Sequence, residues 1–162
     1  MEGFEEAFDR LFPLAFRLAR RILGDAAAAE DAAAEALARA YAQWPRVSAL
    51  PHGDAWVLRV ATNLALDQVR RHPPQVQSAA SSEAEELLTL RMALSAALVS
   101  LPRRQRQTVT LRYLGELSEA EVAEALGISS GSVKTHVHRG LAALRARLGP
   151  SIEEVVPLGV DR

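Results

Sequence analysis

Six polar side chains gather at the start of one segment, and their types suit contact with DNA. They are Ser130, Ser132, Lys134, Thr135, His138 and Arg139. Hydroxyl and backbone N–H groups bind phosphate oxygens, while lysine and arginine can donate to the guanine edge in the major groove. Between Glu124 and Glu153 the sequence has no acidic residue that would repel a phosphate. A solvated basic helix face would give a similar pattern, but here we expect DNA contact.

The segment that carries these side chains predicts two helices joined by a tight turn. Ser118 and Glu121 have the spacing of a capping box at the start of the first helix. Ala123 is small where the helices would cross, Gly127 suits the turn, and Val133 anchors the second helix. This spacing is the steric signature of a DNA-reading helix-turn-helix. The second helix, over 129–148, also carries an apolar stripe for its core face: Val133, Val137, Leu141, Leu144 and Leu148.

A second basic cluster consists of Arg103, Arg104 and Arg106, with Arg112 further along the same predicted helix. Cations at the start of a helix gain nothing from the helix dipole. The cluster therefore hints at an anionic partner, although solvated surface explains it equally well.

The sequence offers little for metal or catalytic chemistry. His136 and His138 are two residues apart, so on a helix they point to different sides and are poorly placed to chelate a metal. The chain has no cysteine, which excludes disulfides and thiol catalysis. It also has no Gly-rich phosphate loop and no nucleophile elbow. We expect no metal, no cofactor and no enzymatic activity.

The charge balance of the 162 residues is nearly neutral. The sequence has 19 Lys and Arg residues and 20 Asp and Glu residues, which gives a formal net charge of -1. That total alone argues against a nucleic-acid binder, which usually has a basic excess. Residues 91–148, however, carry nine basic residues and only four acidic ones, and a near-neutral total suits a protein that binds DNA only together with a partner. No apolar run approaches the roughly 20 residues that span a bilayer, and the acidic start is unlike a signal peptide. We expect a cytoplasmic protein without membrane insertion.

The apolar spacing predicts an all-α fold of two small helical domains joined by a flexible linker, the second containing the helix-turn-helix. We expect domains at 1–72 and 87–149, a linker at 73–86 that begins with two prolines, and a short tail at 150–162. In the first domain we expect helices over 8–22, 25–44 and 55–71, capped by Asp25 and Asp54, with a loop over 45–53. Trp56, Val60, Leu64 and Ala61 should face inward. In the second we expect helices over 87–100 and 102–114 before the helix-turn-helix.

Two stretches of the first domain resemble conserved region 2 of bacterial RNA polymerase sigma factors: AAAAEDAAAEALARAYAQW and DAWVLRVATNLALDQVRR. A stretch of the second domain resembles region 4 of the same proteins: ALVSLPRRQRQTVTLRYLGELSEAEVAEALGISSGSVKTHVHRGLAALRARL. The resemblance covers about residues 4–148 and is that of the extracytoplasmic-function, or group IV, sigma factors. It implies a protein that binds core RNA polymerase and directs promoter-specific initiation by recognising the -35 element and melting the -10 element.

The resemblance also implies roles for particular residues. Contact with the β′ clamp helices of the polymerase falls to Glu30, Asp31, Glu35 and Arg39, and the second domain would meet the β flap. Binding of the -10 strand falls to Trp56, Arg59, Asn63, Arg70 and Arg71, with the loop over 45–53 shaping a pocket for an unstacked base. The six polar residues of the second helix would contact the -35 element. The family commonly has Gln at Ala34 and an aromatic at Leu37, so we expect a weaker β′ contact here.

Two other functions and one further partner remain open. A free-standing helix-turn-helix regulator would bind duplex DNA without polymerase, usually as a dimer on a two-fold site. Such a regulator needs a ligand or dimerisation domain, for which the first domain shows no signature. The chain could instead be a pure interaction module that has lost DNA binding, which the basic window on 129–148 argues against. Because many relatives are held inactive by an anti-sigma factor, such a factor is a candidate partner.

Overall fold

The computed structural model describes residues 3–73 and 82–156, and every regular element in these ranges is helical. The first unit contains α1 (Phe4–Leu23), α2 (Ala26–Tyr41), α3 (Trp44–Val47) and α4 (Gly53–Arg71). The second contains α5 (Glu83–Ser100), α6 (Arg103–Val109), the π-helix η1 (Thr110–Leu114), α7 (Glu119–Leu126), α8 (Ser130–Leu148), the 3-10 turn η2 (Gly149–Ser151) and α9 (Ile152–Val155). Among these helices none is long and apolar enough to cross a membrane.

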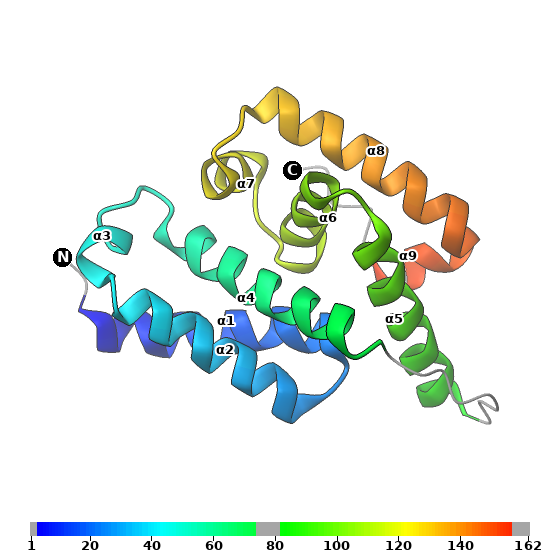
Figure 1. Cartoon of the computed structure of the whole chain (residues 1–162), viewed down its shortest axis with the longest axis horizontal. Helices are drawn as coiled ribbons and strands as arrows, with labels where there is room; N and C mark the ends of the chain where they lie inside the picture. The colour runs from blue at the N-terminus through cyan, green and yellow to red at the C-terminus, as the bar shows by residue number, and fades with distance from the viewer. Residues whose placement is uncertain (1–2, 74–81, 157–162) are drawn as a thin grey trace.

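Helices α1, α2 and α4 pack together as the first unit (Figure 1). Alanines such as Ala15, Ala33 and Ala61 are fully buried between them, and small side chains let helices approach closely. Gly24 ends α1 with a φ of 71°. As predicted, the Asp25 carboxylate caps α2 by accepting from the backbone N–H of Ala28 at 2.7 Å.

Three local predictions for the first unit were wrong. Helix α2 ends at Tyr41, and the expected loop contains α3, because Pro45 lies in the first turn of a helix, where its missing N–H is not needed. Asp54 does not cap α4, which starts at Gly53 without a side-chain cap; its carboxylate pairs with Arg10 of α1 instead.

Helix α4 buries a wider face than its apolar spacing predicted. Val60 and Ala61 are buried as expected, while Trp56 and Leu64 are only half-buried against the core. The reason is that α4 packs against α1 and α2 on one side and against helices of the second unit on the other (Figure 1). The structure therefore has one continuous core, with α4 at its centre.

The second unit follows the sequence prediction closely at its caps. The Ser118–Glu121 capping box is present, Gly127 ends α7 with a φ of 63°, and Ser129 caps α8. Helix α5 begins at Glu83, four residues earlier than expected, because Ser82 caps it by accepting from the Glu85 N–H. The helix that starts after Pro102 changes to π geometry over its last turn.

The segment after α8 packs into the second unit. Ile152 and Val156 are each 1% exposed, and α9 lies against α5 and α8. The sequence predicts only a short tail here, because two apolar residues, Ile152 and Val156, are too few to show a helical period. The structure makes them part of the core.

Helices α6 and α8 approach each other closely at Gly140. A Cβ at this glycine would lie 2.6 Å from Cγ2 of the buried Val109. Glycine is therefore needed where α8 crosses α6, which fixes how α8 is presented to solvent.

Candidate nucleic-acid interface

The polar face at the start of α8 is accessible in the structure. Ser130, Lys134, Thr135, His138 and Arg139 are exposed and Ser132 is half-buried. The opposite face buries Val133, Leu141 and Leu144, with Val137 and Leu148 partly covered, as the predicted stripe requires. The helix thus presents the predicted polar set outward and is held by its apolar stripe.

Some groups of this polar face already have partners within the second unit. The Ser129 hydroxyl accepts from the Ser132 N–H at 3.1 Å and shares a hydrogen bond with its hydroxyl, while the Thr135 hydroxyl donates to the Gly131 carbonyl. Lys134 Nζ lies 3.8 Å from a Glu119 carboxylate oxygen. Within the described part of the chain, His138 and Arg139 have no hydrogen-bond or ion-pair partner. These two side chains are therefore free to meet a base edge or a phosphate.

Arg59 and Asn63 lie on the face of α4 that the second unit covers. Arg59 donates from Nη1 to the Ala125 carbonyl at 3.0 Å, while its Nε is buried and has no partner. Gln107 donates from Nε2 to Oδ1 of Asn63 at 3.1 Å. Burial lowers the pKa of the Arg59 guanidinium, and Arg104 adds to this, yet arginine remains charged at any physiological pH. Both α4 groups are thus held by α6 and α7.

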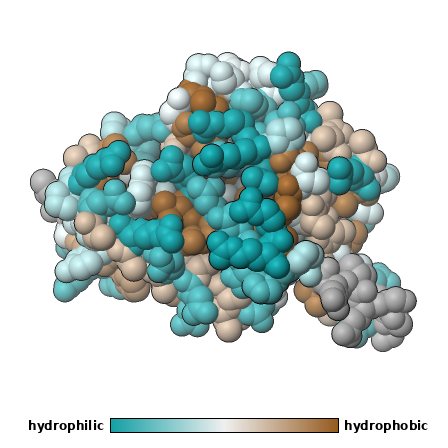
Figure 2. Space-filling view, viewed as in Figure 1, coloured by the Kyte–Doolittle hydropathy of each residue, from teal (hydrophilic) through white to brown (hydrophobic). Residues whose placement is uncertain are grey.

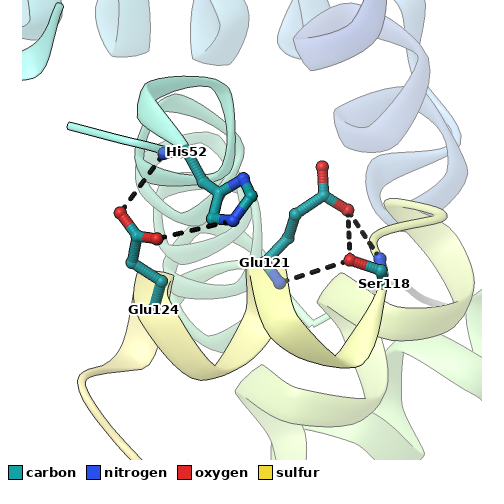
Figure 3. Close-up of polar contacts among 4 residues, drawn as sticks. All are labelled: His52, Ser118, Glu121 and Glu124. Carbon is teal, nitrogen blue, oxygen red and sulfur yellow. Dashed lines mark hydrogen bonds and ion pairs between the residues drawn. The ribbon is translucent and has the colours of Figure 1, made fainter.

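A cavity of about 280 Å³ lies beside the turn between α3 and α4. Trp44, Val47 and Leu50 line it from the first unit, and Glu121 lines it from α7. The Ser118 backbone N–H and hydroxyl both donate to the Glu121 carboxylate at 2.7 Å, which fixes its position (Figure 3). An acidic side chain of the second unit therefore lies where the sequence predicts a pocket for an unstacked base.

A second glutamate of α7 contacts the same turn. The His52 backbone N–H donates to Glu124 Oε1 at 3.2 Å, and His52 Nε2 lies 3.6 Å from Glu124 Oε2 (Figure 3). Both side chains are more than 30% exposed, so this contact contributes little by itself. Its position matters more, because it adds a further carboxylate to the surface of α7 that faces the first unit.

The other predicted -10 residues differ in exposure. Trp56 is half-buried against the core, as an anchoring aromatic would be. Arg70 and Arg71 are exposed near the end of α4, and Arg70 pairs with Asp67 at 3.0 Å. Hydrophilic residues gather over α4 and α6 in the middle of the face shown in Figure 2.

The predicted polymerase contacts share one exposed side of α2: Glu30, Asp31, Glu35 and Arg39. Glu35 and Arg39 pair at 2.8 Å, one turn apart. Of the two departures from the family, Ala34 is exposed but Leu37 is 1% exposed and belongs to the core. Leu37 can therefore change the packing beneath this face but cannot itself contact a partner.

Three residues that the sequence prediction missed hold the two units together at this face: His52, Gln107 and Glu124. Gln107 is 4% exposed, and it precedes the buried Leu111 and Leu114 by four and seven residues. A polar side chain on the apolar face of a helix needs a buried hydrogen-bond partner. The spacing of Gln107 from these leucines could therefore have indicated that it makes a buried contact. No comparable pattern marks His52 or Glu124.

Comparison with known protein families matches both units of the chain. Residues 7–73 match the model of sigma-70 region 2, and residues 91–144 match that of sigma-70 region 4. The chain is 35% identical over 147 residues to the ECF RNA polymerase sigma factor SigW of Bacillus subtilis (strain 168), across 78% of this chain and 79% of that protein. It is 34% identical over 133 residues to the RNA polymerase sigma-E factor of Streptomyces coelicolor, across 78% and 75%.

Two solved structures share the fold. The sigma factor RpoE, in complex with the anti-sigma factor NepR from Bartonella quintana, matches with a TM-score of 0.57 at 20% identity and covers 98% of each chain. CnrH, in complex with the cytosolic domain of CnrY, matches with a TM-score of 0.58 at 22% identity, over 88% of this chain and 85% of that one.

Proposed function

This chain belongs to the extracytoplasmic-function group of sigma-70 factors, and from that premise we propose which surface meets each partner. As a sigma factor it binds core RNA polymerase and directs initiation at specific promoters. The observation that carries this function is the presence of region 2 and region 4 in one chain, in that order. A free-standing helix-turn-helix regulator is not favoured, because the first unit matches a sigma region rather than a ligand or dimerisation domain.

We assign polymerase binding and -10 recognition to residues 1–72, and -35 recognition to residues 87–149. Residues 73–82 would connect them, and η2 and α9 belong with the second unit. The exposed side of α2, with Glu30, Asp31, Glu35 and Arg39, would meet the β′ clamp helices, and the second unit would meet the β flap. The acidic start of this side is available to cations of a partner, since Glu30 and Asp31 are exposed.

Recognition of the -35 element falls to the exposed start of α8. His138 and Arg139 have free polar groups for base edges, while Ser130, Ser132, Lys134 and Thr135 suit phosphate contacts. Support comes from the geometry: Gly140 lets α8 seat closely on α6, and its apolar stripe holds the polar face outward.

Recognition of the -10 strand falls to the face of α4 that carries Arg59 and Asn63, with Trp56, Arg70 and Arg71 beside them. The Asn63 amide can donate and accept, as reading a base edge requires. In this structure Gln107 and the Ala125 carbonyl hold the polar groups of this face. A DNA strand and the second unit therefore compete for α4, so the two units must separate before the -10 strand binds.

Core polymerase would drive that separation by binding each unit at its own surface. We place the chain in the cytoplasm with the polymerase, and we assign it no catalytic step, because RNA synthesis belongs to the polymerase. Because RpoE was solved in complex with the anti-sigma factor NepR, we also propose that an anti-sigma factor can hold this chain.

Transcription in vitro tests the function. Core polymerase is incubated with genomic DNA fragments, with and without the chain, and RNA 5′ ends are mapped. The proposal requires new promoter-specific starts that depend on the chain. If no such start appears while the chain alone binds duplex DNA tightly, the sigma assignment fails and the regulator takes its place.

A further inference from the structure

A polar cleft of about 300 Å³ lies between the two units, where α4 faces α6. It is lined by three guanidinium groups, two carboxamides and one carboxylate from the described residues: Arg70, Arg103, Arg106, Asn63, Gln107 and Asp67. Residues of both units contribute, so the cleft exists only while the units are packed together. Arg103 and Arg106, two residues of the basic cluster for which the sequence suggests an anionic partner, line this cleft.

The arginines around the cleft repel one another. Burial lowers the pKa of Arg106, Arg70 and Arg103 lower it further, and only Asp67 acts in the opposite direction. Burial also lowers the pKa of neighbouring Arg59, which lies one turn before Asn63 on α4, and the charges of Arg104 and Arg103 lower it further. Because arginine cannot lose its proton in a protein, this repulsion is not relieved by deprotonation. A second negative charge in the cleft would relieve it.

Donor groups remain available for such a charge. Arg103 is exposed and has no hydrogen-bond or ion-pair partner in the described part of the chain. Arg106 donates from Nη1 to the Val99 carbonyl at 3.0 Å, and Arg70 donates from Nη2 to Asp67. Each guanidinium has five N–H donors, so all three arginines keep several for a ligand.

We propose that this cleft binds a compact, multiply charged phosphoanion that bridges α4 to α6. A phosphate group offers tetrahedrally arranged oxygens and more than one negative charge, which suits guanidinium groups that converge from two helices. A single carboxylate, as Asp67 already shows, leaves most of the positive charge unbalanced. The same chemistry could come from a free oligophosphate or from a nucleic-acid backbone. The packing of the two units favours the free oligophosphate over a nucleic-acid backbone, because the second unit covers Arg59 and Asn63 on the same face of α4.

Calorimetric titration of the full chain with inorganic triphosphate tests the proposal. We expect one binding site per chain, and Arg103→Ala should weaken the affinity about tenfold through loss of charge-assisted hydrogen bonds. Asp67→Asn should tighten binding severalfold, because it removes the opposing charge. The matched control is Arg17→Ala, which removes another exposed arginine, on α1, and should change nothing. Equal affinity of the wild type and Arg103→Ala, or an equal loss in Arg17→Ala, would overturn the proposal.

A second measurement separates the two sources of phosphate. The chain has no native cysteine, so dyes can be placed at exposed Ala38 on α2 and Ala142 on α8 by substitution with cysteine. A bridging anion favours the packed form, and triphosphate should therefore raise energy transfer between the dyes. If triphosphate does not bind but a single-stranded oligonucleotide does, and Arg103→Ala weakens the latter, the cleft is a backbone contact and the proposal is wrong. Transcription with the nucleotide substrates alone and no added inorganic triphosphate tests the sigma function separately.

Discussion

The substitution Gln107→Leu should make the isolated chain bind the -10 strand more tightly. The Gln107 side chain is only 4% exposed, and leucine keeps its volume. The substitution removes the amide that donates to Asn63 of the first unit. Asn63 is only half-buried, so water can replace the lost donor when the units separate. The variant should therefore weaken the packing of the two units without emptying the core of the second.

The expected size follows from one hydrogen bond. A neutral intramolecular hydrogen bond contributes about 1 kcal/mol net, so its loss shifts the equilibrium toward separated units about fivefold. When the binding-competent form is a minor one, apparent affinity scales with its population. The affinity for DNA should then rise by about the same factor.

Fluorescence anisotropy with a labelled non-template strand, taken from a promoter mapped in the transcription assay, measures this affinity. Thr108→Val is the matched control, because the Thr108 hydroxyl is buried in the same helix but donates to the Arg104 carbonyl within it. The control should bind DNA like the wild type. If Gln107→Leu lowers energy transfer between the Ala38 and Ala142 positions while DNA affinity stays unchanged, then the second unit does not compete with DNA for α4.

Four further substitutions have defined outcomes. Arg139→Ala should reduce initiation from -35-dependent promoters by about tenfold in run-off transcription, with core binding intact, since a base contact contributes about 1–3 kcal/mol. Asn63→Ala should slow promoter opening, seen as weaker permanganate reactivity of -10 thymines; unchanged reactivity would remove Asn63 from the site. Asp31→Ala should weaken binding to core polymerase in a pull-down titration and leave thermal stability unchanged, because Asp31 is exposed. Gly140→Ala should lower the free energy of unfolding by about 1–3 kcal/mol in urea, because its Cβ would meet Val109; a stabilised variant would show that α6 and α8 can move apart.

Features set by neighbours in sequence were predictable. The Asp25 cap, the Ser118–Glu121 box and the glycine at Gly127 are decided by a few consecutive residues, and the structure confirms all three. The apolar stripe of α8 likewise follows from its spacing alone. Such signals place the helix-turn-helix and its polar face without any knowledge of the rest of the chain.

Features that depend on residues distant in the sequence could not be predicted. Asp54 could cap a helix or pair with Arg10, and only the packing of α1 against α4 decides for the ion pair. The Asn63–Gln107 hydrogen bond joins residues 44 apart and leaves no periodic trace in the sequence. Arg59 and Asn63 could be assigned to DNA binding from the family resemblance, but their cover by the second unit depends on tertiary contacts.

The central place of α4 has a consequence for the order in which the protein is made. Helices α6 and α7, which hold Asn63 and Arg59, are translated after α4, about 55 residues in all up to Leu126. At about 5–20 residues per second, the ribosome needs roughly 3–11 s for that stretch. During those seconds the side of α4 that bears Arg59 and Asn63 has nothing to pack against. The nascent chain therefore passes through a stage in which this face is open to ligands that the finished protein excludes.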